Sequence, residues 1–477
     1  MKDSQVSKSV RWTATSNVLR AAISFIQIVV LARVIPPSEF GVLAIVAAVQ
    51  MFAASFSEAG ISSAIIHFQN LTETQKSALF WWNMLASAVV YILVAALGYP
   101  LSQFYHNDRL TFLILISASV LVINAASQQL KALAERDMLF APLAKIEIAS
   151  SILGLVVSIA MAFSGFGIMS IIISQIAMAF MSSIMSWLFL SNGWLPSWHI
   201  NARETLPFVR YGAGVLVVNI LNLLISQIDI VILGRLVPPH LLGLYSQPRD
   251  LGLKIMTVIN PVITRVGFPM MARHKHDKQS LARIYLKTMR MSASVSFPIF
   301  AALSLFSQEI VSIIYGSNWG GAVPYLKALS IWFLVRSVGN PLGGLLYAVG
   351  RTRVAFIQSV SLLAVMPIGV YLAASFDAKF VPLALITIHG FLIPIVWKFI
   401  IQPICGANLL RCVMQIIPPA TSVVLTVAVI VALRTIFPIT GPSSLVIYGA
   451  ISAVVYLLMS LLLNREWIDE MVRLVSK

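Results

Sequence analysis

The sequence predicts an all-α membrane protein of about 14 transmembrane helices, in two pseudo-symmetric six-helix lobes plus two extra C-terminal helices. Three observations lead to this class. The 477 residues are 59% hydrophobic and only 10% charged, whereas a soluble protein carries about 25% charged residues. The apolar runs are long enough to cross a bilayer as helices of about 20 residues. One of these runs also occurs twice, together with its polar residues.

Apolar runs divide the chain into about fourteen predicted spans, joined by short loops throughout. No extramembrane segment is therefore large enough to hold an active site of its own. The predicted spans cover approximately residues 12–35, 40–66, 78–101, 110–132, 143–164, 167–191, 211–235, 241–268, 288–307, 325–349, 354–374, 380–401, 413–434 and 444–463.

The repeated run defines the two lobes. Residues Ile23–Gly41 read ISFIQIVVLARVIPPSEFG, and residues Ile225–Gly243, 202 positions later, read ISQIDIVILGRLVPPHLLG. The second copy lies six predicted spans after the first, so both run in the same direction and the lobes are parallel repeats. We therefore expect an N-terminal lobe of helices 1–6 (1–205), a C-terminal lobe of helices 7–12 (206–405), and helices 13–14 with a cytoplasmic tail (406–477).

Basic residues alternate between the two sides of the predicted membrane. Most lie on the side that carries both termini, and the other side has only Arg33, Arg109, Arg235, Lys327, Lys379 and Arg434. The positive-inside rule then predicts that both termini are cytoplasmic. It also accounts for the net charge of +16, so we expect no nucleic-acid partner. The basic run over residues 272–290 is interpreted as a topology determinant, with binding of anionic membrane lipids as the alternative.

A polar stripe accompanies the repeated helix. Its members are spaced three or four residues apart and so share one helix face. Their counterparts recur in the second copy, which indicates two related halves that face a common hydrophilic space, as in a transporter. The stripe consists of Asn17, Arg20, Ser24 and Gln27, and its counterparts are Asn219, Asn222, Ser226 and Asp229.

Three arginines lie within predicted spans, where ionisable side chains are costly and usually face a cavity or a partner. Arg20 is on the polar stripe, Arg249 lies in span eight, and Arg336 lies near the middle of span ten. Asp250 and Lys254 have the i, i+4 spacing of an ion pair, which would leave Arg249 free. We expect the arginines to line a central cavity and bind phosphate, whose oxygens match the guanidinium fork.

Carboxylates within the predicted spans raise the question of ion coupling. Glu58, Asp229 and Asp250 are candidates to carry a proton or to help hold Na⁺. In the alternative interpretation each carboxylate only balances an arginine, with Glu58 or Asp229 pairing with one of Arg20, Arg249 and Arg336 from another helix. The residues of the sequence leave both interpretations open.

Catalytic motifs are missing from the sequence. It has no G-x-S-x-G elbow, no P-loop and no H-E-x-x-H zinc motif. We therefore expect a protein that is not an enzyme and that uses no cofactor or metal. A membrane-embedded polysaccharide polymerase would need a larger outer loop than the short stretch from Gln308 to Lys327.

Several segments resemble the Wzx-type polysaccharide and O-antigen flippases. These belong to the polysaccharide transporter family of the multidrug/oligosaccharidyl-lipid/polysaccharide (MOP) superfamily, and the colanic-acid-exporter-like branch is the most similar. The resemblance covers about residues 8–400. It is carried by LARVIPPSEFGVLAIV from Leu31, SEAGISSAII from Ser57, LGRLVPPHLLGLYS from Leu233, IIYGSNWGGAVPYLKAL from Ile313, and YAVGRTR from Tyr347.

The resemblance implies a fourteen-helix, two-lobed fold with an alternating-access cycle. The implied substrate is an undecaprenyl-pyrophosphate-linked oligosaccharide, flipped from the cytoplasmic to the periplasmic leaflet of the bacterial inner membrane. The products would be exopolysaccharide, O-antigen or capsule, made with a polysaccharide polymerase or export machinery as partner. Arg20 and Arg249 fit the family's cationic cavity, whereas the family's acidic ion-site residues do not align clearly onto Asp229 or Glu58. The alternatives are an ion-coupled multidrug exporter, which would need an acidic cavity, and more remotely a polysaccharide polymerase.

Overall fold

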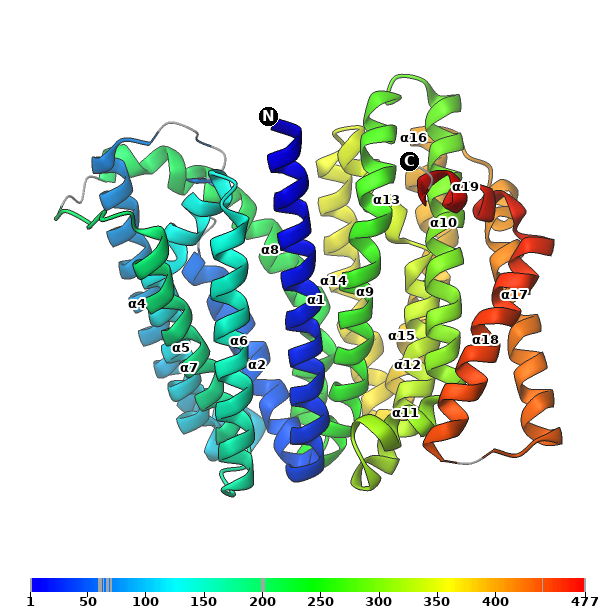
Figure 1. The fold of residues 1–477 in the computed structure, drawn as a ribbon, viewed down its shortest axis with the longest axis horizontal. Helices are drawn as coiled ribbons and strands as arrows, with labels where there is room; N and C mark the ends of the chain where they lie inside the picture. Colours follow the sequence, from blue (N-terminus) through cyan, green and yellow to red (C-terminus); the bar gives the residue numbers. More distant parts are fainter. Residues whose placement is uncertain are drawn as a thin grey trace. The chain divides into compact units, whose positions relative to one another are not determined.

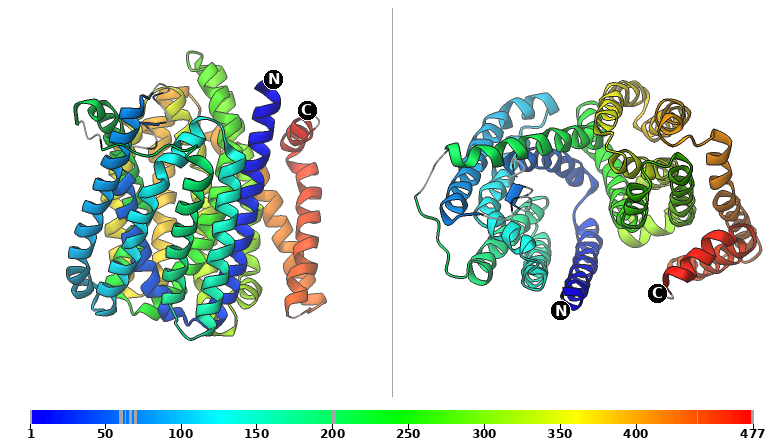
Figure 2. Two further views of the ribbon diagram at one scale, coloured as in Figure 1. Left: turned by 60° about the vertical axis from the view of Figure 1, so that its left-hand side comes forward. Right: turned by 90° about the horizontal axis from the view of Figure 1, so that it is seen from above.

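Every element of the computed structural model is a helix within the residues that it describes, which are 2–58, 62, 64, 65, 68, 71–198, 202–439 and 441–475 (Figure 1). Within each of the two units defined below, the long helices run side by side (Figure 2). The helices are α1 (Lys2–Val34), α2 (Pro37–Glu58), α4 (Glu73–Tyr105), α5 (Arg109–Arg136), α6 (Phe140–Phe163), α7 (Met169–Leu190), α8 (Ala202–Leu236), α9 (Pro239–Arg273), α10 (Lys278–Leu305), α11 (Ser307–Ile314), η1 (Ser317–Ala322), α12 (Val323–Ser337), α13 (Asn340–Ala348), α14 (Thr352–Phe376), η2 (Ala378–Phe380), α15 (Val381–Val396), η3 (Trp397–Ile401), α16 (Gln402–Cys405), α17 (Leu409–Ile436), α18 (Pro442–Leu463) and α19 (Arg465–Val475).

Eleven helices in the described residues are long and apolar enough to cross a bilayer. The pair α10 and α11, bent by 76°, makes a twelfth if it is counted as one broken span. The predicted spans 241–268 and 325–349 coincide with α9 and with the pair α12 and α13, which are not among the eleven. Span 40–66 begins within α2, and its positions 59–61, 63 and 66 lie outside the described residues. The count of fourteen therefore stays a prediction.

Local sequence explains where several helices begin and end. The Thr72 hydroxyl accepts from the backbone N–H of Gln75, whose side chain accepts in return from the Thr72 N–H, so α4 begins with a capping box. Asp277 and Asn408 are the N-caps of α10 and α17. Each accepts, through a side-chain oxygen, from the backbone N–H two residues later. α16 ends at Gly406, whose φ of +72° is the left-handed conformation that suits glycine.

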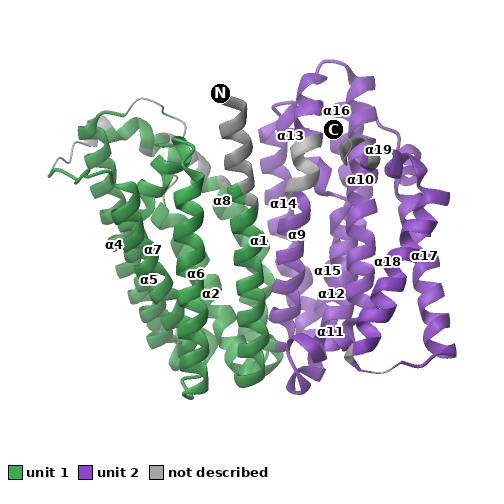
Figure 3. Cartoon of the chain, viewed as in Figure 1, with its two compact units in different colours: residues 1–243 green, residues 244–477 purple. Residues whose placement is uncertain are grey.

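The helices form two compact units, residues 1–243 and 244–477 (Figure 3). In the N-terminal unit α6 packs against α1 and α7, α5 packs against α4 and α7, and α2 packs against α4, α5 and α8. In the C-terminal unit α10 contacts α12, α13 and α17, while α15 contacts α12 and α14. The lobe boundaries that the repeat predicted, after residues 205 and 405, stay a prediction.

Serine side chains are frequent in the N-terminal unit, and many of them donate to backbone carbonyls of their own helices. The hydroxyls of Ser150, Ser174 and Ser186 donate to backbone carbonyl oxygens three or four residues earlier, at 2.7–2.8 Å. Each of these serines is at most 3% exposed. Small residues of this kind allow helices to approach closely where lipid supplies no hydrophobic drive for association.

The two copies of the repeated segment meet within the N-terminal unit. A Cβ atom at Gly41 of α2 would overlap the carbonyl oxygen of Pro239, and one at Gly243 would overlap the carbonyl oxygen of Pro37. The same two hypothetical Cβ atoms would lie 3.0–3.1 Å from the backbone nitrogen of the other glycine. The recurrence of glycine in the repeat therefore has a physical cause, because the crossing leaves no room for a side chain on either backbone.

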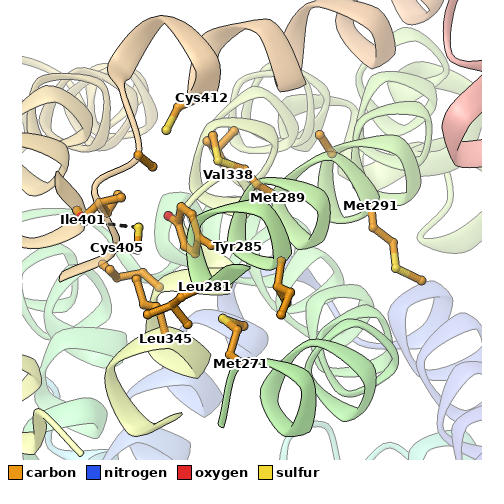
Figure 4. Close-up of a cluster of buried hydrophobic side chains, with 14 of the residues drawn as sticks. Met271, Leu281, Tyr285, Met289, Met291, Val338, Leu345, Ile401, Cys405 and Cys412 are labelled. Atoms are coloured by element: carbon orange, nitrogen blue, oxygen red, sulfur yellow. Dashed lines mark hydrogen bonds between the residues drawn. The ribbon is translucent and has the colours of Figure 1, made fainter. Parts of the chain in front are cut away.

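The core of the C-terminal unit surrounds the first half of α10 (Figure 4). Tyr285 of α10 is 1% exposed and lies among side chains from α9, α13 and η3. Both cysteines belong to this core as free thiols, and the Cys405 Sγ donates to the Ile401 carbonyl oxygen at 3.3 Å. The labelled members of the cluster are Met271, Leu281, Tyr285, Met289, Met291, Val338, Leu345, Ile401, Cys405 and Cys412.

The C-terminal helix α19 is held against α10 by both charge and apolar burial. Glu466 and Glu470 of α19 form ion pairs with Arg290 and Lys287 of α10, respectively. Trp467, between the two acids, is 9% exposed and belongs to the core cluster. The acids on α19 and the cations on α10 are therefore each about one helical turn apart, which lets both ion pairs form.

Trp467→Ala is expected to destabilise the protein by about 3 kcal/mol, because it removes a large buried side chain. Glu470→Gln is expected to cost less than about 1 kcal/mol, because the Lys287 partner is 52% exposed. Thermal unfolding of the purified protein in detergent measures both changes. Equal losses in the two variants would contradict the view that apolar burial, rather than charge, anchors α19.

Candidate functional site

The N-terminal unit contains a cavity of about 560 Å³ among α1, α2, α5, α6 and α7. Part of the lining is apolar and includes Met51, Leu121 and Met178. The remaining lining is polar and carries two cations and one carboxylate. The polar residues are Arg20, Gln50, Asn124, Lys131, Glu147, Ser150, Ser151, Gln175 and Ser182.

Arg20, one of the four predicted stripe residues, enters this cavity from α1. Its Nη1 lies 3.1 Å from the Oε2 of Glu147 on α6. The Ser16 hydroxyl, one turn earlier on α1, donates to the same carboxylate oxygen at 3.0 Å. The Arg20 and Glu147 side chains are 45% and 40% exposed, so the pair stays accessible from the cavity. Neither carboxylate proposed as a balance for Arg20, Glu58 or Asp229, is the partner in this ion pair.

Lys131 of α5 is the second cation of the cavity, and sequence reasoning missed it. Lys131 is the penultimate residue of the predicted span 110–132, where a basic residue indicates one of the cations of the cytoplasmic side, but α5 continues to Arg136. Its Nζ donates to the Ser182 hydroxyl of α7 at 2.7 Å. A signal was present, because Asn124, Gln128 and Lys131 have the spacing of one helix face.

The four stripe residues of the first repeat lie in different environments in the structure. Gln27 donates to the Ser158 hydroxyl of α6 at 3.0 Å, so it links two helices. Asn17 and Ser24 are exposed and are not among the residues that line the cavity. Of the four predicted stripe residues on α1, Arg20 alone belongs to the described cavity lining.

The stripe of the second repeat, on α8, lies outside the lining of this cavity. Asn219 and Asn222 are exposed, and Ser226 is half-buried with its hydroxyl donating to the Leu223 carbonyl oxygen at 2.9 Å. Asp229 is 3% exposed, and its Oδ1 accepts from the Ile230 N–H at 3.0 Å. Glu58, at the end of α2, is half-buried.

The other two predicted arginines belong to the C-terminal unit. Arg249 is 2% exposed, and its Nη1 lies 3.2 Å from the Oδ1 of Asp250, the next residue. The prediction that Asp250 would leave Arg249 free is therefore wrong, because the carboxylate reaches the adjacent guanidinium. The half-buried Arg336 guanidinium lies 5.2 Å from the centre of the Trp332 ring, a cation–π contact on its own helix.

The chain is similar to proteins that are named for polysaccharide biosynthesis. It is 28% identical over 373 residues to "Teichuronic acid biosynthesis protein TuaB" of Bacillus subtilis (strain 168), covering 77% of this chain and 76% of the relative. It is 26% identical over 346 residues to "Lipopolysaccharide biosynthesis protein WzxC" of Escherichia coli (strain K12), with 72% and 70% covered. These similarities confirm the resemblance that the sequence motifs indicated.

A solved structure shares the fold. "Lipid II flippase MurJ, inward closed conformation" superposes with a TM-score of 0.74 at 14% identity, covering 96% of this chain and 99% of that one. The family model described as "Polysaccharide biosynthesis protein" matches residues 30–324, which is more than half of the chain. The chain therefore belongs to the polysaccharide biosynthesis protein family, with a fold like that of MurJ.

Proposed function

We propose that the protein is a flippase for undecaprenyl-pyrophosphate-linked oligosaccharides. It would move the lipid-linked repeat unit from the cytoplasmic to the periplasmic leaflet of the bacterial inner membrane by alternating access. The exported units would serve synthesis of exopolysaccharide, O-antigen or capsule. The observation that carries this proposal is the cavity of the N-terminal unit, with Arg20 and Lys131 in one polar lining. The family membership and the MurJ-like fold support it.

The cavity has the chemistry that a pyrophosphate headgroup needs. A phosphate that enters the membrane loses hydration, and fixed cations replace part of what it loses. Arg20 offers a planar fork of donors, and Lys131 adds a compact charge. The amides of Gln50, Asn124 and Gln175 would contact sugar hydroxyls or water. A volume of about 560 Å³ lies within the usual range of small-molecule sites.

We also propose how the protein is oriented in the membrane and which ion gradient drives transport. Both termini would be cytoplasmic, as the distribution of loop charges predicted. Proton or Na⁺ coupling would use Glu58, Asp229 or Asp250, and a polymerase would receive the flipped unit. The alternative, export of cationic drugs, would require the opposite sign of charge in the cavity, where two cations face one carboxylate.

Complementation of a flippase-null strain tests the proposal. Arg20→Gln and Lys131→Gln are each expected to reduce polymer export about tenfold or more, because each removes a charge-assisted contact to phosphate. Arg109→Gln is the matched control, since Arg109 pairs with Glu39 outside the cavity, and it should export normally. Normal export by the Arg20/Lys131 double variant, at wild-type protein levels, would refute the proposed site.

A further inference from the structure

The two cavity cations differ in their partners within the N-terminal unit. Lys131 donates to a neutral hydroxyl, that of Ser182. Arg20 contacts a carboxylate, that of Glu147, through only one guanidinium nitrogen at 3.1 Å. Glu147 is also held by Ser16, whose hydroxyl donates to the same oxygen at 3.0 Å. Arg20 therefore forms an ion pair with a carboxylate of the protein, whereas Lys131 hydrogen-bonds a neutral hydroxyl and is attracted by Glu147 only at longer range.

The Arg20–Glu147 contact is weak enough to exchange. Both side chains are nearly half-exposed, and ion pairs of this kind shift an equilibrium by no more than about fivefold. A phosphoryl group can accept two parallel N–H bonds from one guanidinium, which is a stronger arrangement than a single contact. The arriving phosphate would therefore displace the carboxylate without a large cost.

We propose that Glu147 is a built-in competitor for the phosphoryl groups of the substrate. It holds Arg20 when no substrate is bound, gives way to phosphate on binding, and returns to Arg20 as the phosphate leaves. A transport site must bind its cargo firmly enough to admit it and weakly enough to release it. Glu147 lowers the cost of release, because the departing phosphate does not leave Arg20 without an anionic partner. This inference rests on the proposed function and assigns a role within the same cavity.

Ser16 positions the competitor. It is 2% exposed and lies one turn before Arg20 on α1, so its hydroxyl keeps the carboxylate beside the guanidinium. When phosphate takes Arg20, the Ser16 hydroxyl still has Glu147 as acceptor. The carboxylate therefore retains one hydrogen bond in both arrangements, which limits the cost of the exchange.

Binding of farnesyl pyrophosphate to the purified full-length protein, measured by calorimetry, tests the proposal. Glu147→Gln is expected to tighten binding about two- to fivefold, because the competitor loses its charge. The same change in an Arg20→Gln background is expected to have a clearly smaller effect, because the direct contact is lost and only the longer-range attraction between Glu147 and Lys131 remains. Glu39→Gln breaks the Arg109 ion pair outside the cavity and is expected to leave binding unchanged.

Several results would overturn the proposal. Unchanged or weaker binding by Glu147→Gln would do so. Equal tightening in the Arg20→Gln background would do so as well, since it would show a general effect of cavity charge. If Glu147→Gln does not fold, Glu147→Asp replaces it: its shorter side chain withdraws the carboxylate from Arg20, and a smaller tightening is expected. Unchanged binding by Glu147→Asp would then count against the competitor.

Export assays separate this inference from the proposed function. Glu147→Gln is expected to bind the pyrophosphate more tightly and yet to export more slowly, which a purely structural role would not produce. If Arg20→Gln and Lys131→Gln both bind farnesyl pyrophosphate like the wild type, the proposed function fails. If they weaken binding but Glu147→Gln does not tighten it, the competitor role alone fails.

Discussion

Gly41→Ala adds a single methyl group and is expected to destabilise the protein by about 3 kcal/mol or more. The new Cβ would overlap the carbonyl oxygen of Pro239, which is backbone and cannot rotate away. α2 begins at Pro37 and α9 begins at Pro239, and a proline ring fixes φ at both positions. Neither backbone can therefore move without disturbing the start of its helix. The thermal midpoint of the purified protein and its level in the membrane measure the loss.

Gly243→Ala should behave like Gly41→Ala, because the crossing is reciprocal. The double variant should lose less than the two single losses together, since both substitutions strain one contact. Gly390→Ala in α15 is the matched control, because a Cβ there meets no atom within 4 Å. That control should be neutral or slightly stabilising, as alanine favours helix over glycine. A mild Gly41→Ala variant would contradict the close crossing.

Arg249→Ala is expected to cost about 3 kcal/mol of stability, mainly because it removes the packing of a large buried side chain. The side chain is 2% exposed, so its removal leaves both a cavity and an Asp250 carboxylate without this ion-pair partner. Thermal unfolding and protein level are again the measurements, and polymer export is recorded in parallel. The sequence predicted a substrate-binding role for Arg249, whereas its burial favours a role in holding the C-terminal unit together.

Arg249→Met distinguishes these two roles, because methionine fills much of the same space without charge. If the arginine acts by packing, Arg249→Met should restore most of the stability and most of the export. If it binds phosphate, this variant should be stable but should not export. Arg283→Ala is the control for loss of an exposed arginine from the same unit, and it should change stability by less than about 0.5 kcal/mol.

Part of the candidate site was predictable from residues close together in the chain. The stripe on α1 placed Arg20 on a polar helix face, and the structure puts it in a polar cavity. Lys131 was missed because it lies at the end of its predicted span, where basic residues usually mark the cytoplasmic side, although α5 continues beyond it. Glu147 was missed because its partner lies more than a hundred residues earlier on another helix. A residue pattern within one helix does not reveal which other helix packs beside it.

The sequence by itself determined that the chain is helical and membrane-spanning, that one segment is duplicated, and that its family handles polysaccharide. These features depend on local hydropathy, helical periodicity and recurring motifs, which are properties of contiguous residues. The tertiary structure alone decided that Arg20 faces Glu147, that the Arg249 side chain is buried, and that Gly41 crosses Gly243. The reason is physical, because the role of a charged residue or a glycine depends on the atoms packed against it. Those atoms belong to helices that are distant in the sequence and meet only in the folded unit.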